Sequence, residues 1–168
     1  MSSQQYPHDV ARQIKKGRTL QERIDDPYKE RLKLSEPTSC PDCGAVYHQG
    51  RWHWGASVAN SKPHRCPACA RIHDKVPAGF LILSGQYIKT HEEEILRHIK
   101  NLEQKEKTQH PLERIMSIDS TPQGITINYT GIHLAQGTGK TLQEAHQGEL
   151  KIEYSDKSGQ IRVTWFRE

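Results

Sequence analysis

Two Cys-x-x-Cys pairs constrain this chain more than any other feature of its sequence. They are Cys40 with Cys43 and Cys66 with Cys69, and residues 44–65 lie between them. A tight turn over two intervening residues aims both sulfurs at one ion, and two such turns complete a tetrahedron. Because the chain has 4 cysteines in all, this site leaves no coordination position open. The sequence therefore predicts one structural zinc ion.

Two other interpretations of the cysteine pairs stay open, a rubredoxin-like iron site and a redox-active pair. Redox chemistry usually uses one exposed pair on a thioredoxin-like βαβ frame, whereas this segment has two pairs spaced as in a zinc ribbon. Structural zinc is the preferred interpretation. It also suits a chain with 33% apolar residues and a mean hydropathy of -0.85, because a thin core needs a second source of stability.

Length and charge narrow the class of protein. The 168 residues fit one ordinary domain, and the longest apolar run, residues 80–83, is far shorter than the roughly 18 residues of a membrane span. The chain starts without the features of a secretory signal, so we expect a cytoplasmic protein. A net charge of +4, with its basic excess in the first half, suits a polyanion such as RNA, although many proteins of this charge bind no nucleic acid.

Three regions follow one another along the chain. Residues 1–37 are expected to form a basic tail, because they have too few apolar side chains for a core of their own. Residues 38–84 should form the zinc ribbon and include a strand at 80–83. Residues 85–168 should form a long helix and a small antiparallel β-β-α-β-β unit, which makes the fold α+β.

The long helix has the clearest local signals. Thr90 and Glu93 have the spacing of a capping box, which predicts a helix over residues 91–107. Turn residues at 121–124 and 156–159 predict two β-hairpins. The strands of these hairpins are expected at residues 115–118, 125–129, 150–154 and 161–166, with a weak helix at 132–147 between them.

An aromatic and basic cluster lies between the cysteine pairs. Arg51, Trp52 and Trp54 could contact phosphate and stack on the bases of single-stranded or looped RNA. The alternative is that both tryptophans roof the small ribbon core. Three basic residues beside the second cysteine pair are expected to be exposed and are the preferred phosphate contacts: Arg65, Arg71 and Lys75.

Residues 137–141 read Gly-Thr-Gly-Lys-Thr, which invites comparison with a phosphate-binding loop. Such a loop needs a glycine where Leu134 stands and a strand leading directly into it, so we expect no nucleotide site. No pair of carboxylates indicates catalysis, and every cysteine is assigned to metal. The sequence therefore favours a non-enzymatic protein.

The stretch from Cys40 to Trp54 resembles a group of uncharacterised bacterial proteins built around Cys-Pro-x-Cys-Gly-Ala-Val-Tyr-His…Arg-Trp-x-Trp. These are distantly similar to the N-terminal part of the nonsense-mediated-decay protein three family, whose eukaryotic members are export adaptors for the large ribosomal subunit. That family's further cysteine pairs are missing from this sequence. The matching positions are Cys40, Cys43, Gly44, Cys66 and Cys69, and the strand, helix and strand around residues 124–154.

The resemblance implies binding to the ribosome or to ribosomal RNA, and it does not imply nuclear export. Fold-level similarity is a weak warrant for function. The first hypothesis is a zinc-ribbon protein that binds RNA on the large ribosomal subunit, as an assembly, quality-control or dormancy factor. The second is an adaptor that docks on proteins through its ribbon, as in transcription assemblies, and whose basic tail folds onto its partner.

Overall fold

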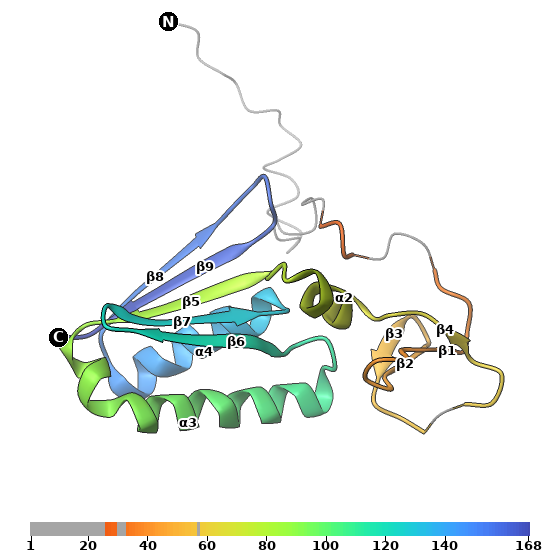
Figure 1. Ribbon diagram of the computed structural model, residues 1–168, viewed down its shortest axis with the longest axis horizontal. Coiled ribbons are helices and arrows are strands. Elements are labelled where there is room, and N and C mark those ends of the chain that lie inside the picture. Colours follow the sequence, from red (N-terminus) through yellow and green to blue (C-terminus); the bar gives the residue numbers. More distant parts are fainter. Residues whose placement is uncertain (1–25, 30–32, 57) are drawn as a thin grey trace, which may run out of the picture.

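The structure is a computed structural model that describes residues 26–29, 33–56 and 58–168. A small ribbon sheet and a short helix precede a larger unit, in which two long helices accompany a five-stranded sheet (Figure 1). The expected α+β class is confirmed. The expected basic tail, residues 1–37, lies mostly outside the described residues.

The ribbon sheet has the strand order β3-β2-β1-β4, so β3 and β4 are its edges. Its strands are short because the chain turns repeatedly around the cysteine pairs. Their bounds are Thr38–Ser39 for β1, Val46–His48 for β2, Arg51–His53 for β3 and Lys62–Pro63 for β4. Helix α2, Pro67–Asp74, follows directly and carries the second cysteine pair at its start.

The larger sheet has the order β6-β7-β5-β9-β8. Its central strand β5, Gly79–Ser84, is antiparallel to β7 and parallel to β9. The sheet is therefore mixed rather than purely antiparallel, and β5 belongs to it rather than to the ribbon, which corrects the expected boundary at residue 84. The other strands are β6 at Ile115–Thr121, β7 at Gly124–Tyr129, β8 at Glu149–Tyr154 and β9 at Ile161–Phe166.

Helices α3, Gln86–Gln109, and α4, Ile132–His146, complete the core of this sheet unit. Alternate strand residues are buried, such as Leu81 and Leu83 of β5, because successive side chains of a strand point to opposite faces. One face of the sheet thus supplies the core. No helix in the described ranges is long and apolar enough to cross a membrane. The helical side chains of the core are Ile88, Ile95, Ile99, Leu134, Ala135 and Leu142.

The structure places a short helical segment before the predicted start of the long helix and joins the two across a kink at His91. Helix α3 begins at Gln86, although its backbone leaves the helical region at His91, where φ is -124° and ψ is 19°. The Thr90 hydroxyl donates back to the Tyr87 carbonyl, 3.1 Å away, so it forms no capping box with the amide of the next turn. The first turn of α3 forms because Tyr87 packs against the sheet unit.

The Gly-Thr-Gly-Lys-Thr segment, residues 137–141, lies inside helix α4 rather than in a loop after a strand. Its Gly139 touches the sheet so closely that a Cβ there would lie 2.5 Å from Val163 Cγ1. The Thr138 hydroxyl donates to the Leu134 carbonyl at 2.7 Å, as is usual for threonine within a helix. Gly139 therefore serves the packing of this helix on the sheet.

Candidate metal centre

The two cysteine pairs are presented by different local structures. Cys40 and Cys43 lie in a turn after β1. Gly44 closes this turn: its φ is 79°, and its backbone N–H donates a hydrogen bond to the Cys40 carbonyl at 2.9 Å. Such a φ suits glycine. Cys66 caps the N-terminus of α2, with Pro67 in the first helical position, and the helix then brings Cys69 to the same side.

The four sulfur atoms form one compact group. All of them lie within 4.8 Å of one another, and the Sγ atoms of Cys43 and Cys66 are 3.8 Å apart. Four thiolates around one tetrahedral ion, with metal–sulfur bonds of about 2.3 Å, have sulfur–sulfur separations of about 3.8 Å. The donor set and its spacing therefore fit a metal ion, and the group can hold one.

Backbone amides point at this cluster and shape its electrostatics. The Cys66 amide donates to Cys40 Sγ at 3.3 Å, and the Cys69 amide donates to Cys66 Sγ at 3.4 Å. Burial alone would raise the pKa of Cys40, but amide donors outweigh burial and lower this pKa to about 7. Burial raises the pKa of Cys66, and neighbouring thiolates raise it further. A deprotonated four-sulfur group at this site thus requires positive charge nearby.

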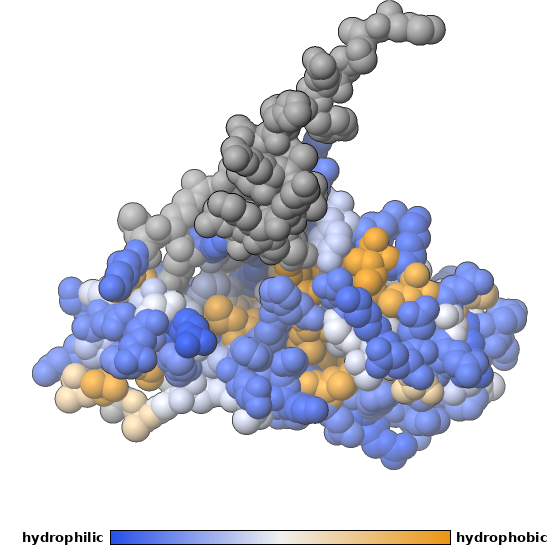
Figure 2. Space-filling view, turned by 180° about the vertical axis from the view of Figure 1, so that it is seen from behind, coloured by the Kyte–Doolittle hydropathy of each residue, from blue (hydrophilic) through white to orange (hydrophobic). Residues whose placement is uncertain are grey.

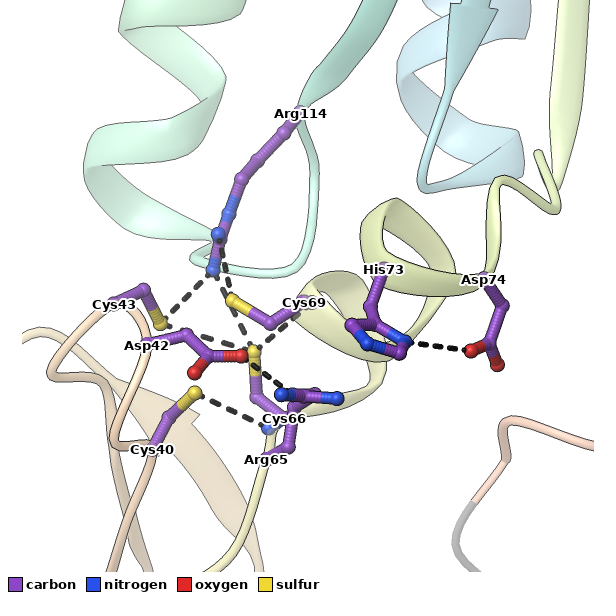
Figure 3. A network of polar contacts seen from close by, with 9 residues as sticks. All are labelled: Cys40, Asp42, Cys43, Arg65, Cys66, Cys69, His73, Asp74 and Arg114. Atoms are coloured by element: carbon purple, nitrogen blue, oxygen red, sulfur yellow. Dashed lines mark hydrogen bonds and ion pairs between the residues drawn. The ribbon is translucent and has the colours of Figure 1, made fainter.

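Arg114 supplies one such charge from the sheet unit (Figure 3). Its guanidinium is buried and donates to Cys43 Sγ at 3.2 Å and to Cys69 Sγ at 3.3 Å. Its Nε donates to the Pro111 carbonyl at 2.7 Å, which fixes the side chain. Burial opposes the charged form, but the hydrogen bonds to both cysteines outweigh it and raise the pKa of Arg114.

This contact joins the ribbon to the sheet unit, because Arg114 lies just before β6. Trp54 adds a second connection: its indole Nε1 donates to the Lys107 carbonyl at 2.6 Å, and its ring lies 5.5 Å from the Arg114 guanidinium carbon. Sequence reasoning missed Arg114, which is 45 positions from Cys69 and belongs to no motif. Only the folded chain brings this arginine to the sulfur atoms.

Trp52 points into the ribbon. It alternates with exposed neighbours along β3, is 8% exposed, and meets the Tyr47 ring edge-on at 5.6 Å between centroids. It therefore belongs to the ribbon core, as the structural alternative for the tryptophans predicts. Trp54, just beyond the strand, is 37% exposed.

The basic residues expected at the RNA surface have different environments. Arg71 is only 6% exposed, so the expectation that it is exposed is wrong. Its guanidinium forms an ion pair with Asp26 at 2.6 Å and lies 4.4 Å from the centre of the Tyr28 ring. The partners that bury Arg71 are far away in the sequence, so local composition could not reveal them.

Three of the expected basic contacts do reach the surface. Arg51 is exposed on β3, and Lys75 is exposed at the end of α2, where its φ is 57°. Arg65 is exposed as well but forms an ion pair with Asp42 at 2.5 Å. The basic surface is therefore narrower than the sequence suggested, and part of its charge is already neutralised.

A groove separates the ribbon from the sheet unit. A hollow of about 590 Å³ and a neighbouring hollow of about 400 Å³ share Trp52 and Glu113 in their walls. Glu113 accepts a hydrogen bond from the Leu134 amide at 3.0 Å, near the start of α4. Gly131 allows this approach, because a Cβ there would collide with the carboxylate. Burial raises the pKa of Glu113.

Comparison with known proteins adds no assignment. A scan of protein-family models gave no match, and neither curated proteins nor solved structures gave a significant one.

Proposed function

We propose that this chain is a non-enzymatic, cytoplasmic zinc-ribbon protein that binds RNA, with the large ribosomal subunit as its expected partner. Its role would be that of an assembly, quality-control or dormancy factor. The metal would be one structural zinc ion on Cys40, Cys43, Cys66 and Cys69. Support for zinc comes from the four-sulfur donor set and its tetrahedral spacing.

One observation carries the RNA proposal, the alternation of side chains along the edge strand β3. Trp52 points inward, while Arg51 and His53 on either side of it are exposed, and the half-exposed Trp54 follows. In the described part of the chain, Arg51 has no carboxylate within ion-pair distance. An exposed cation on the same strand as an exposed imidazole, with a partly exposed indole just after it, can contact phosphate and stack on unpaired bases.

The test is co-sedimentation of the full chain with ribosomes over a range of salt concentrations. Arg51→Ala combined with Lys75→Ala removes two exposed ribbon charges. If both contact phosphate, binding weakens and the slope of log affinity against log salt falls in magnitude by about 1.4, since each contact to single-stranded nucleic acid contributes about 0.7. Arg71 is unsuitable for this test, because its loss would disturb the fold.

Arg97→Ala is the matched control, because Arg97 is an exposed arginine on α3, outside the ribbon. We expect this variant to bind with nearly the wild-type salt slope. The proposal is wrong if the folded, zinc-loaded double variant binds ribosomes as the wild type does, or if Arg97→Ala weakens binding equally.

A second candidate function, docking on a protein, is favoured by an apolar hollow of the ribbon that shares Trp54 with the proposed RNA-binding face. A hollow of about 570 Å³ is lined by Pro37, Val46, Trp54 and Val58, of which Val58 is 45% exposed. Figure 2 shows an apolar patch among hydrophilic residues at the ribbon end, on the left of that view. Apolar hollows of this kind suit a protein partner more than phosphate. A salt-insensitive complex that contains no RNA would favour this adaptor function.

A further inference from the structure

A cluster of histidine, tyrosine and arginine side chains lies in the sheet unit, apart from the cysteines. It combines Tyr87 and His98 of α3, His146 at the end of α4 and Arg167 just after β9. In Figure 1 the chain ends at one end of the molecule, close to the start of α3, and the ribbon sheet lies at the other end. The function proposed for the ribbon makes no use of these residues.

The two histidines face each other through ring nitrogens. His98 Nδ1 and His146 Nε2 are 3.4 Å apart. This is longer than an ordinary hydrogen bond from a nitrogen donor, which spans about 2.7–3.2 Å. Two imidazole nitrogens on one tetrahedral ion, each about 2.0–2.1 Å from it, lie about 3.3–3.4 Å apart. The separation thus also fits a cation shared by the two rings.

Tyr87 orients the buried member of the pair. Its hydroxyl is 3.3 Å from His146 Nδ1, so it can accept a hydrogen bond from Nδ1–H in the tautomer that leaves the lone pair of Nε2 directed at His98. Metal-binding histidines usually donate their second ring N–H in this way. The Tyr87 ring is itself fixed, since His91 stacks on it with 3.9 Å between centroids and the Arg167 guanidinium lies 3.8 Å from its centre.

Some charged residues near the histidine pair favour a bound cation, and others oppose it. Glu94 lies one helical turn before His98, so both side chains are on the same side of α3. In the described part of the chain its carboxylate does not lie within ligand distance of both rings, so it would have to turn toward the pair to serve as a third ligand. Arg167 donates to the His146 carbonyl and brings an opposing positive charge. We therefore expect weaker binding than at a group of four thiolates.

From this geometry we propose that His98, His146 and Glu94 bind one divalent transition-metal ion of the zinc type. Two imidazoles and one carboxylate form a donor set that zinc accepts, with a position left for water. The ion would connect α3 to α4. This site is independent of the RNA proposal, and either can fail without the other.

The test is a calorimetric titration of Zn²⁺ into the full chain whose cysteine group already holds one zinc. We expect one further equivalent to bind. His98→Ala should weaken that binding by about tenfold or more, and Glu94→Gln should also weaken it. Tyr87→Phe should weaken it without abolishing it, because loss of an orienting partner typically costs about 10- to 100-fold in metal affinity.

His133→Ala is the matched control, since His133 is an exposed histidine on α4 outside the cluster. This variant should bind the second equivalent of zinc as the wild type does. Because His146 is buried, His146→Gln is informative only if its circular dichroism is native. If that variant does not fold, the test rests on His98→Ala, because His98 is only half-buried. The proposal is overturned if the wild type binds no second equivalent, if His98→Ala binds it unchanged, or if His133→Ala loses it equally.

Discussion

Arg114 makes the central contact between the ribbon and the sheet unit. Its guanidinium is buried and donates to the sulfurs of Cys43 and Cys69. Four thiolates around a dication keep two net negative charges, so one buried guanidinium offsets half of that excess. Such charge-assisted contacts are stronger than neutral hydrogen bonds. The arginine thus makes the metal group part of the contact between ribbon and sheet unit.

Arg114→Ala should therefore lower the free energy of unfolding by about 3–5 kcal/mol, the usual cost of breaking a buried ion pair. It should also speed the transfer of zinc to a chelator. Arg114→Lys keeps the charge but lacks the planar guanidinium whose separate nitrogens reach both sulfurs and the Pro111 carbonyl, so its effect should be intermediate. Urea unfolding and a colorimetric zinc assay measure both quantities. Wild-type values for Arg114→Ala in both would contradict this role.

Glu113 allows a prediction about pH. Burial raises its pKa above the ordinary value of 4.5, so the folded chain holds this proton more tightly than the unfolded chain. Glu113 therefore contributes most to stability at pH values below 4.5, and this contribution decreases as the pH rises through the raised pKa. Glu113→Gln does not titrate, and its side-chain oxygen can still accept from the Leu134 amide.

The stability of Glu113→Gln relative to wild type should thus increase as pH rises from 4.5 through the raised pKa, and then level off. Urea unfolding of both proteins across this range measures the difference, in which the shared effect of acid on the cysteines cancels. Glu113→Ala serves as a control that loses stability throughout, because the Leu134 amide loses its partner. A difference that is flat or falls with pH would contradict the assignment.

The elements of the fold follow local sequence closely, whereas their assembly does not. Both hairpins and the ribbon turn form where turn residues predict them. The apolar run in β5 predicted a strand, but not its central place between β7 and β9, which depends on pairing with distant residues. The early start of α3 depends likewise on the packing of Tyr87. Arg71 and Arg114 could not be placed from sequence for the same reason.

Helix α4 offers a matched pair of glycines. A Cβ at Gly139 would meet Val163 and Leu150, whereas a Cβ at Gly137 would meet nothing within 4 Å. Gly139→Ala should cost about 1–3 kcal/mol by overpacking the contact with the sheet. Gly137→Ala should instead stabilise the protein by up to about 1 kcal/mol, because alanine favours the helix. Thermal unfolding measures both, and effects of equal sign would argue against this packing.

At the scale of the whole molecule, the two parts differ in what holds them together. The sheet unit has a core of large apolar side chains, including the fully buried Trp165. The core of the ribbon consists mainly of three cysteines, two alanines and Trp52. We expect so small a core to depend on a metal for folding. We therefore expect metal removal to unfold the ribbon while the sheet unit remains folded.

Cys43→Ser separates these two responses. It should expose Trp52 in the ribbon and leave Trp165 buried, so tryptophan fluorescence should shift only in part. The far-ultraviolet circular dichroism of α3 and α4 should persist. Cooperative loss of both signals would show that the sheet unit depends on the metal as well.

The most direct measurement is X-ray absorption at the metal edge, together with the metal content of protein purified without added metal. The account predicts one zinc per chain with four sulfur ligands at about 2.3 Å. Iron in place of zinc, nitrogen or oxygen ligands at this ion, or a folded ribbon that carries no metal would contradict it.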